Sequence, residues 1–307
     1  MRFVSVGECM IEMSGGEDGL YRLGYAGDTL NTAWYARNCL GEDWSVDYFT
    51  AVGDDRYSDE MLSFLDTHNI GTSRIRRISG RRPGLYLIHL EHGDRHFTYW
   101  RDVSAAKSLA DDAGALKDAL NGAELIYFSG ITLAILAPPA RKSLFEIVET
   151  ARRQGAKSAF DPNVRPVLWP DKDEMRDAFA RAAGVSDFVL PTFGDEAPFF
   201  PDADPLATAV RYRGYGAGEV VVKNGDDAAV ILSGSDRVFA DAVSGAGVVD
   251  PTGAGDSFNG AYLSARLCGH DIGSAAARAH AIAAVVIGHK GALVERALLD
   301  QGALRSE

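Results

Sequence analysis

The stretch 248–260 holds the residue types best suited to chemistry, in the order V-V-D-P-T-G-A-G-D-S-F-N-G. Pro251 and Thr252 break a short apolar run, and small residues then open an alanine-rich helix that we expect to begin near Asp256. Small residues at a helix start let an anion approach backbone N–H groups that have no intrahelical acceptor, and the helix dipole adds about half a positive charge there. The stretch therefore predicts a phosphate-binding turn.

Asp256 needs a separate explanation, because a carboxylate would compete with a phosphate for this position. It could simply cap the helix, since Asp is a favoured capping residue. Capping, however, requires neither the flanking glycines nor the preceding Asp-Pro-Thr. The whole stretch is explained if Asp256 takes a proton from an attacking hydroxyl while the N–H groups of Gly253, Ala254 and Gly255 hold the phosphoryl group. We therefore predict that Asp256 is the general base of a phosphoryl transfer.

The composition limits the class of protein. The chain has 307 residues, enough for one large α/β domain or for two domains. Apolar residues make up 46% and charged residues 24%, which is typical of a soluble globular protein. The net charge of −12 argues against a nucleic-acid partner, because phosphate backbones select basic surfaces. An anionic substrate would therefore need local positive charges.

The cysteines and apolar runs indicate a cytoplasmic location. Cys9, Cys39 and Cys268 lie far apart without a C-x-x-C pair, which suggests a reducing compartment and neither a disulfide framework nor a zinc site. Residues 1–8 predict a strand rather than a signal peptide. No apolar run reaches the ~18 residues that would span a bilayer. We expect no membrane partner.

The order of the predicted elements indicates an α/β protein. Strands and helices alternate from about residue 110 onward, which predicts a mainly parallel sheet covered by helices on both faces. No repeat, low-complexity tract or linker divides the chain, so we predict one domain over residues 1–307. The predicted strands are 3–6, 47–52, 124–129, 157–160, 187–190, 219–223, 228–232 and 238–240. The predicted helices run from Thr29, a possible N-cap, through Cys39, and over 58–68, 112–121, 139–154, 175–183, 205–212, 256–268 and 273–288.

Two hairpin patterns interrupt this alternation. Residues 9–25 and 83–101 are predicted to pair as a small β lid inserted in the α/β core. A lid excludes water from a phosphoryl transfer, in which hydrolysis is the side reaction. Because such a sheet has an exposed face and edges, we also expect it to mediate a homo-oligomer contact.

The run D-P-T-G-A-G-D-S-F-N-G resembles the C-terminal signature of the ribokinase-like (PfkB) carbohydrate kinases. The resemblance implies a three-layer α/β/α core with a β-sheet lid, ATP and Mg²⁺ as cofactors, an anion hole at the glycines and Asp256 as catalytic base. Residues 26–33, A-G-D-T-L-N-T-A, resemble the N-terminal signature, although Ala26 stands where glycine is often found. By this resemblance Gly27 and Asn31 contact the sugar. Taken alone, Gly27 could be only a turn and Asn31 only a polar helix residue.

Arginines and tyrosines suggest the kind of sugar. Arg165 follows a predicted strand, and Arg101 ends the hairpin that carries Tyr86 and Tyr99. A lone arginine is usually solvated, but two arginines and two tyrosines suit a carboxylate and hydroxyls, because guanidinium groups bind carboxylates bidentately. The segments G-L-Y-L-I, F-T-Y-W-R and F-D-P-N-V-R-P-V-L-W resemble the 2-keto-3-deoxygluconate kinases of that family. The resemblance implies that these four residues bind the acid sugar, with Arg165 also near the transferred phosphoryl group.

The resemblance also suggests a metal site. Residues 190–196, L-P-T-F-G-D-E, fall where the family often has an Asn-x-x-Glu motif that organises magnesium through water. Thr192 replaces the Asn, Asp195 takes the place of the Glu, and Glu196 is adjacent. Which carboxylate acts is left open, and both could instead be acids at a helix N-terminus.

A nucleotide site is implied by two further segments. V-K-N-G-D-D resembles the family's Lys-x-Gly loop beside the nucleotide, with Lys223 and Gly225 as contacts, although Asp227 stands where a second glycine is frequent. A lysine that ends a strand could also be merely exposed. H-K-G-A at 289–292 resembles the segment that flanks the adenine, which implies a contact from His289. The resemblance adds the glycines of the anion hole, Gly253 and Gly255, to these nucleotide contacts.

Two alternative functions remain. A sister kinase for a neutral sugar such as fructose or ribose is opposed by the two arginines. A non-catalytic sugar- or nucleotide-binding regulator is opposed by Asp256 and the complete glycine signature. No G-x-x-x-x-G-K motif is present, and G-x-G-x-x-G fails at Phe258. The interpretation that explains most residues is phosphorylation of the terminal hydroxyl of 2-keto-3-deoxygluconate.

Overall fold

The largest element of the computed structural model, which describes residues 1–15, 19–91, 94–243 and 247–302, is a nine-stranded sheet. Its strands, in order across the sheet, are β15 (Asp236–Ala240), β14 (Ala229–Ser233), β13 (Glu219–Val222), β12 (Phe188–Val189), β11 (Lys157–Asp161), β10 (Leu125–Ser129), β1 (Arg2–Val6), β4 (Ser45–Phe49) and β6 (Ile70–Gly71). The neighbouring pairs from β13 to β6 are parallel, whereas β13–β14 and β14–β15 are antiparallel. The predicted, mainly parallel sheet is confirmed.

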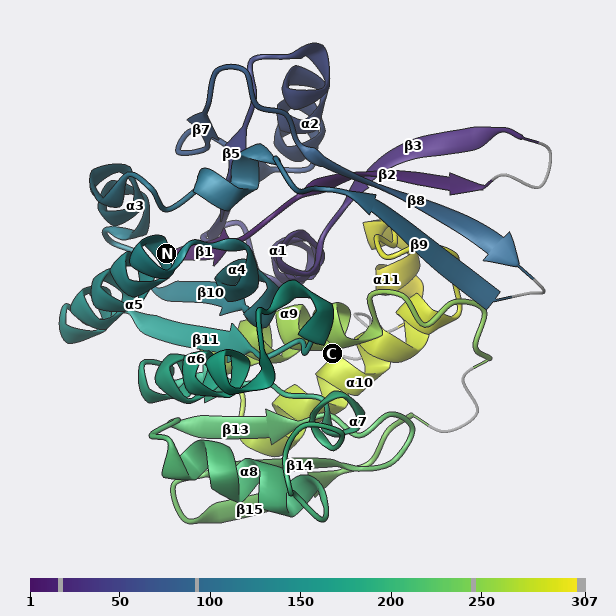
Figure 1. Cartoon of the computed structure of the whole chain (residues 1–307). Coiled ribbons are helices and arrows are strands. Elements are labelled where there is room, and N and C mark those ends of the chain that lie inside the picture. The colour runs from purple at the N-terminus through teal and green to yellow at the C-terminus, as the bar shows by residue number, and fades with distance from the viewer. Residues whose placement is uncertain (16–18, 92–93, 244–246, 303–307) are drawn as a thin grey trace.

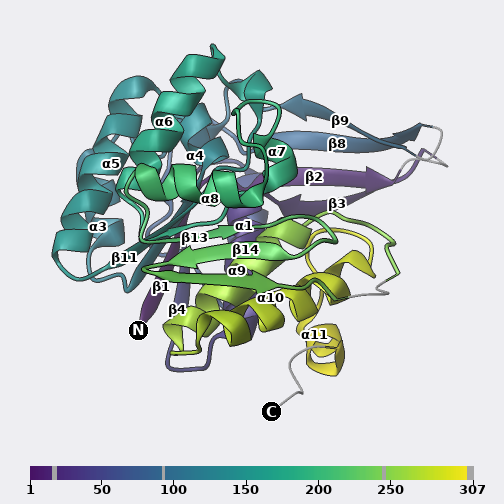
Figure 2. The ribbon, with the colours of Figure 1, turned by 90° about the horizontal axis from the view of Figure 1, so that it is seen from below.

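Helices cover both faces of this sheet and complete three layers (Figures 1 and 2). Alternate strand residues pack to opposite sides, so that Ile126 and Phe128 join one core cluster while Leu125 and Tyr127 join the other. The first cluster includes α3 (Ala113–Leu120), α4 (Gly130–Ile135), α5 (Pro138–Arg153), α6 (Lys172–Gly184) and α8 (Pro205–Gly214). The second includes α1 (Asp28–Cys39), α2 (Arg56–Thr67), α9 (Ala254–Leu267) and α10 (Ile272–Ile287).

The lid is a separate four-stranded sheet that extends from the core (Figure 1). Across this sheet the strands are β3 (Tyr21–Ala26), β2 (Met10–Gly15), β8 (Gly84–Glu91) and β9 (Asp94–Trp100). Each predicted hairpin is antiparallel, and β2 and β8 join the two hairpins as a parallel pair. The lid predicted from residues 9–25 and 83–101 is therefore confirmed.

Some local predictions were wrong. The strand expected over 47–52 is two strands, β4 and β5 (Ala51–Val52), and β5 pairs with β7 (Arg76–Arg77) in a small sheet of its own. The N-cap of α1 is Gly27 rather than Thr29, because the Thr29 hydroxyl is bonded to the Tyr48 hydroxyl at 2.8 Å.

The sequence interpretation also missed three short helices, α4, α7 (Phe193–Glu196) and α11 (Arg296–Gly302). Helix α4 has six residues, too few for a periodic apolar pattern, and its start is fixed by a capping box between Ser129 and Thr132. Among the helices of the described residues, none is long and apolar enough to cross a membrane.

Candidate active site

Helices α1 and α9 approach closely and bring their N-terminal turns together. Gly260 of α9 makes this possible, because a Cβ atom there would lie 2.7 Å from the Thr32 carbonyl oxygen and 2.8 Å from the Tyr35 Cβ. The approach places the amide of Asn31 against the carboxylate of Asp256, with 2.8 Å between Asn31 Nδ2 and Asp256 Oδ2. Two residues that were predicted from separate signatures are thus in direct contact.

The start of α9 has the turn that the sequence predicted. Gly253 is the N-cap and has a φ of 80°, in the left-handed region that favours glycine. A Cβ atom at Gly253 would also lie 2.8 Å from the Ala292 carbonyl oxygen. Asp250 holds the turn, since its carboxylate accepts from the N–H groups of Thr252 at 3.1 Å and Gly291 at 2.8 Å. Sequence reasoning had not given Asp250 this role.

The three predicted anion-binding N–H groups are not equivalent. The N–H of Ala254 donates to the Pro251 carbonyl at 3.2 Å, which closes the turn. The N–H groups of Gly253 and Gly255 have no hydrogen bond of this kind among the described residues, as expected for the first turn of a helix. Gly253 and Gly255 are therefore the better placed of the three to receive an anion.

The carboxylate of Asp256 has an unusual proton affinity. Partial burial and the nearby carboxylate of Asp28 raise its pKa to about 7, and Asp161 adds to the rise. The hydrogen bond from Asn31 and the charge of Lys223 act in the opposite direction. A carboxylate with a pKa near the working pH is well matched to general base catalysis, because it is available in its basic form and still binds a proton effectively.

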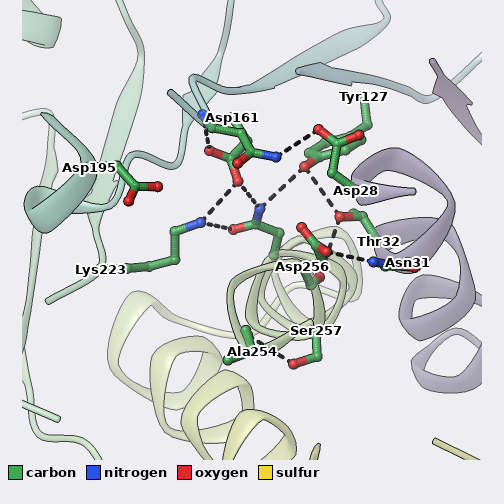
Figure 3. A network of polar contacts seen from close by, with 12 residues as sticks. Asp28, Asn31, Thr32, Tyr127, Asp161, Asp195, Lys223, Ala254, Asp256 and Ser257 are labelled. Carbon is green, nitrogen blue, oxygen red and sulfur yellow. Dashed lines mark hydrogen bonds and ion pairs between the residues drawn. The ribbon is translucent and has the colours of Figure 1, made fainter. Parts of the chain in front are cut away.

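Lys223 lies in a buried network beside this carboxylate (Figure 3). Its Nζ is 3.0 Å from both Asp161 Oδ2 and Asn259 Oδ1, and the Asn259 amide donates to the same Asp161 oxygen at 2.6 Å. A Cβ atom at Gly255 would lie 3.4 Å from Lys223 Nζ. The alternative that this strand-terminal lysine is merely exposed is therefore wrong, and its cation lies at the start of α9.

The network contains polar residues that the sequence interpretation did not single out. The Asn259 amide is 3.2 Å from the Tyr127 hydroxyl, and the Asn163 amide donates to Asp28 Oδ2 at 2.8 Å. Burial raises the pKa of Asp28. Asn259 belongs to the F-N-G end of the glycine signature and Asn163 to the D-P-N-V-R segment, so the motifs contained the signal although no role was assigned.

Arg165 and Asp195 form an ion pair at the edge of the site. Arg165 Nη1 is 3.5 Å from Asp195 Oδ2, and both side chains are about half exposed. The same guanidinium donates to the Val164 carbonyl at 2.7 Å. Figure 3 shows the Asp195 carboxylate directed toward Lys223 and Asp161. A cation and a carboxylate are thus both accessible at this edge.

Glu196 has different surroundings from Asp195, although both lie in the short helix α7 (Phe193–Glu196). The Glu196 side chain is fully buried and accepts from the Tyr212 hydroxyl at 2.8 Å and from Arg211 at 2.7 Å. Burial raises its pKa to about 7. Its oxygens are therefore engaged away from Asp195. Among the described residues, no group of three His, Cys, Asp or Glu side chains could hold a metal ion directly.

The lid brings its predicted substrate residues toward Arg165. The rings of Tyr86 and Tyr99 have centroids 5.8 Å apart. Burial raises the pKa of Tyr99, while the charges of Arg101 and Arg165 act against this rise, so both arginines lie near its hydroxyl. The structure thus brings together all four residues predicted to bind an acid sugar.

Arg101 is paired with a buried acid that the sequence interpretation missed. Its guanidinium forms an ion pair with Glu8, whose side chain is buried in the segment that follows β1. Burial raises the pKa of Glu8, and the charge of Arg101 acts against that rise. Gly27 packs on the same residue, since a Cβ atom there would lie 2.3 Å from the Glu8 carbonyl oxygen. Position 27 in the N-terminal signature therefore requires glycine, because the backbone of Glu8 approaches it too closely for a side chain.

The predicted nucleotide residues occupy two turns. Gly225 has a φ of 64° in the exposed turn between β13 and β14. His289 follows α10, and its Nδ1 is 2.8 Å from the Val285 carbonyl oxygen. The Ile287 carbonyl accepts from the N–H groups of residues 249 and 250, which places the His289 segment beside the turn that opens α9.

Residues 2–296 match the pfkB family carbohydrate kinases, and the chain belongs to this family. It is 38% identical to the 2-dehydro-3-deoxygluconokinase of Escherichia coli (strain K12) over 299 residues, which cover 95% of this chain and 96% of that protein. It is 34% identical to the enzyme of the same name from Haemophilus influenzae, with 98% of each chain covered. The fold is similar to that of a putative ribokinase II from E. coli in complex with ATP and Mg²⁺, with a TM-score of 0.82 at 23% identity and coverage of 98% and 95% of the two chains.

Proposed function

We propose that this carbohydrate kinase transfers the γ-phosphoryl group of ATP to the terminal hydroxyl of 2-keto-3-deoxygluconate, also called 2-dehydro-3-deoxygluconate. The observation that carries the proposal is the Asp256 carboxylate, held by Asn31 at the start of α9 with a pKa of about 7. Asp256 accepts the proton of the C6 hydroxyl as the new O–P bond forms. The bond between the γ-phosphorus and the oxygen that leaves with ADP breaks in the same transfer.

The residues at the start of α9 fit the phosphates of ATP. The N–H groups of Gly253 and Gly255 and the ammonium group of Lys223 are donors at one helix N-terminus, where negative charge is favoured. Gly225 and His289 are proposed to flank the rest of the nucleotide. Bound ATP with Mg²⁺ would supply the phosphoryl group and part of the charge that stabilises its transfer.

For magnesium we propose Asp195 as the organising carboxylate, acting through water. It is half exposed and faces the site, whereas the oxygens of Glu196 are engaged by Arg211 and Tyr212. The sequence left open whether Asp195 or Glu196 organises magnesium, and we propose Asp195 for this reason. Carboxylate and water oxygens are the ligands that Mg²⁺ prefers.

Asp195→Asn and Glu196→Gln should therefore differ in their effects. Asp195→Asn is expected to raise the Mg²⁺ concentration needed for half-maximal turnover about tenfold or more, with an unchanged melting temperature. Glu196→Gln is expected to leave the Mg²⁺ requirement nearly unchanged, because its side chain is buried away from Asp195 and its raised pKa shows that the folded chain also accommodates the neutral form. Magnesium titrations and melting temperatures of both variants check this. The reverse pattern would transfer the metal role to Glu196.

The substrate assignment is supported by the cations of the lid and of Arg165. Arg101 presents a guanidinium whose charge is offset by Glu8, and Arg165 adds a half-exposed guanidinium whose charge also acts on Tyr99. Both can donate to a carboxylate. ADP release should be measured with ATP and Mg²⁺ on 2-keto-3-deoxygluconate, gluconate, fructose and ribose. Turnover only on a neutral sugar would keep the mechanism and discard the acid-sugar substrate.

Removing these cations should affect the acid sugar selectively. Arg165→Ala is expected to raise the KM for 2-keto-3-deoxygluconate about 10- to 100-fold, because a hydrogen bond to a charged group is lost. Arg101→Lys keeps a charge opposite Glu8 but removes the bidentate fork, and it should raise the same KM. Arg56→Ala, at an exposed site on α2, is the control. Unchanged KM values in both variants would refute the carboxylate clamp.

We also propose that the lid forms the contact of a homo-oligomer. Several large apolar side chains of the lid are exposed, including Leu23, Phe97 and Trp100 at 40%, 42% and 58%. An exposed patch of this kind favours association with a second copy of the chain. Sedimentation analysis should give a mass above that of the monomer, and a monomeric mass at micromolar concentration would refute the contact.

A further inference from the structure

Glu12, Tyr86 and Tyr99 lie in one row across the lid. The strand register pairs Glu12 of β2 with Tyr86 of β8, and Tyr86 with Tyr99 of β9. Directly opposed residues of neighbouring strands project from the same face of a sheet. Because Tyr99 lies near Arg101 and Arg165, this face is the one turned toward the substrate residues.

The hydroxyl proton of Tyr86 is used in a hydrogen bond within the lid. The Tyr86 hydroxyl donates to Glu12 Oε2. Burial raises the pKa of Tyr86 well above its usual value, and the charge of Glu12 raises it further, so the side chain stays a neutral phenol. A phenol has one proton to donate. Toward a ligand, the Tyr86 oxygen can therefore only accept a hydrogen bond.

The other predicted substrate residues, on this face and beside it, can donate hydrogen bonds. The guanidinium groups of Arg101 and Arg165 can only donate. The hydroxyl of Tyr99, which is half exposed, has no hydrogen-bond partner among the described residues, so its proton is available. Donors that suit a carboxylate thus stand beside one acceptor that suits a hydroxyl.

We propose that Tyr86, held by Glu12, accepts a hydrogen bond from the C4 hydroxyl of the acid sugar and so makes the enzyme sensitive to the configuration at C4. This inference rests on the proposed function. If the donors hold the C1 carboxylate, the next carbons are the C2 carbonyl and C3, which has no hydroxyl. The first hydroxyl that can donate is then at C4, while C6 extends to Asp256. Glu12 acts as a positioning residue for Tyr86.

Two variants separate this role from a structural one. For each, kcat/KM is measured on 2-keto-3-deoxygluconate and on its C4 epimer, 2-keto-3-deoxygalactonate. The wild type should prefer one epimer. Tyr86→Phe removes the acceptor, and Glu12→Leu removes the carboxylate that holds the Tyr86 proton, so that this proton can turn to the ligand. Both should lower the epimer ratio about tenfold, mainly through KM. Tyr25→Phe, a buried tyrosine of β3 that packs on Phe64, is the matched control and should keep the wild-type ratio.

The outcomes distinguish this inference from the proposed function. An equal preference for the two epimers in the wild type would overturn the inference, as would an unchanged ratio in both variants. Turnover of the acid sugar would leave the proposed function intact in either case. A changed ratio in Glu12→Leu alone would also overturn the role of Tyr86. If the wild type did not phosphorylate the acid sugar at all, the proposed function itself would fail. Melting temperatures show that each variant is folded.

Discussion

Asp256→Asn is expected to lower kcat by about 10²- to 10⁴-fold, the usual contribution of a positioned general base. An amide has nearly the shape of the carboxylate but cannot accept the proton of the attacking hydroxyl. ADP release at saturating substrate checks the loss. Asp271→Asn, at the exposed N-cap of α10, is the matched control, because Asn is as good a capping residue as Asp. Near-normal turnover in Asp256→Asn would remove Asp256 as the base.

The pH dependence tests the same assignment. The pKa of Asp256 in the folded chain is about 7, above its usual value of 3.8. The basic form therefore grows as pH rises, and kcat/KM of the wild type should increase through about pH 7. The raised pKa also means that the folded state binds this proton more tightly than the unfolded state, so the free energy of unfolding falls as pH rises from 3.8 to about 7, and the full loss is present above pH 7. Asp256→Asn should thus gain melting temperature relative to the wild type at pH 8, and gain less at pH 5.5.

Lys223→Met is the second substitution with a large expected effect. It removes a buried cation from the start of α9, and we expect kcat to fall about 10²- to 10³-fold, as for other donors that stabilise transition-state charge. Since Lys223 lowers the pKa of Asp256, its loss should also move the pH profile to higher pH. Rate measurements between pH 6 and 9 show both changes.

A control makes this result specific to the position of the charge. Lys157→Met removes an exposed lysine at the start of β11 and should leave kcat and the pH profile unchanged. The Asn259 amide still donates to Asp161 in Lys223→Met, so part of the network remains. An unchanged pH profile with reduced kcat would refute the coupling of Lys223 to Asp256.

The sequence could predict those parts of the site that are local in the chain. The turn at Gly253, the start of α9 and the two lid hairpins depend on residues a few positions apart, and turn and alternation patterns express them directly. The three-layer core followed from the alternation of strands and helices. These features required no knowledge of distant contacts.

The missed residues depend on contacts between distant parts of the chain. Glu8 pairs with Arg101 across 93 positions and Asn259 with Asp161 across 98, and no local pattern records either pair. A lysine at the end of a strand is often exposed, and Lys223 is buried because α9 packs against the sheet beside it. Glu196 and Asp195 are neighbours in sequence, but Arg211 and Tyr212 engage only the first of them.

The contact between Asn31 and Asp256 joins residues 225 positions apart. During protein synthesis Asn31 therefore leaves the ribosome long before Asp256 and the turn at Gly253 have been made. If Asp256 is the base, as we propose, a chain that ends before this turn should not transfer phosphate from ATP. The order of the residues along the polypeptide would thus delay the activity until synthesis has passed α9.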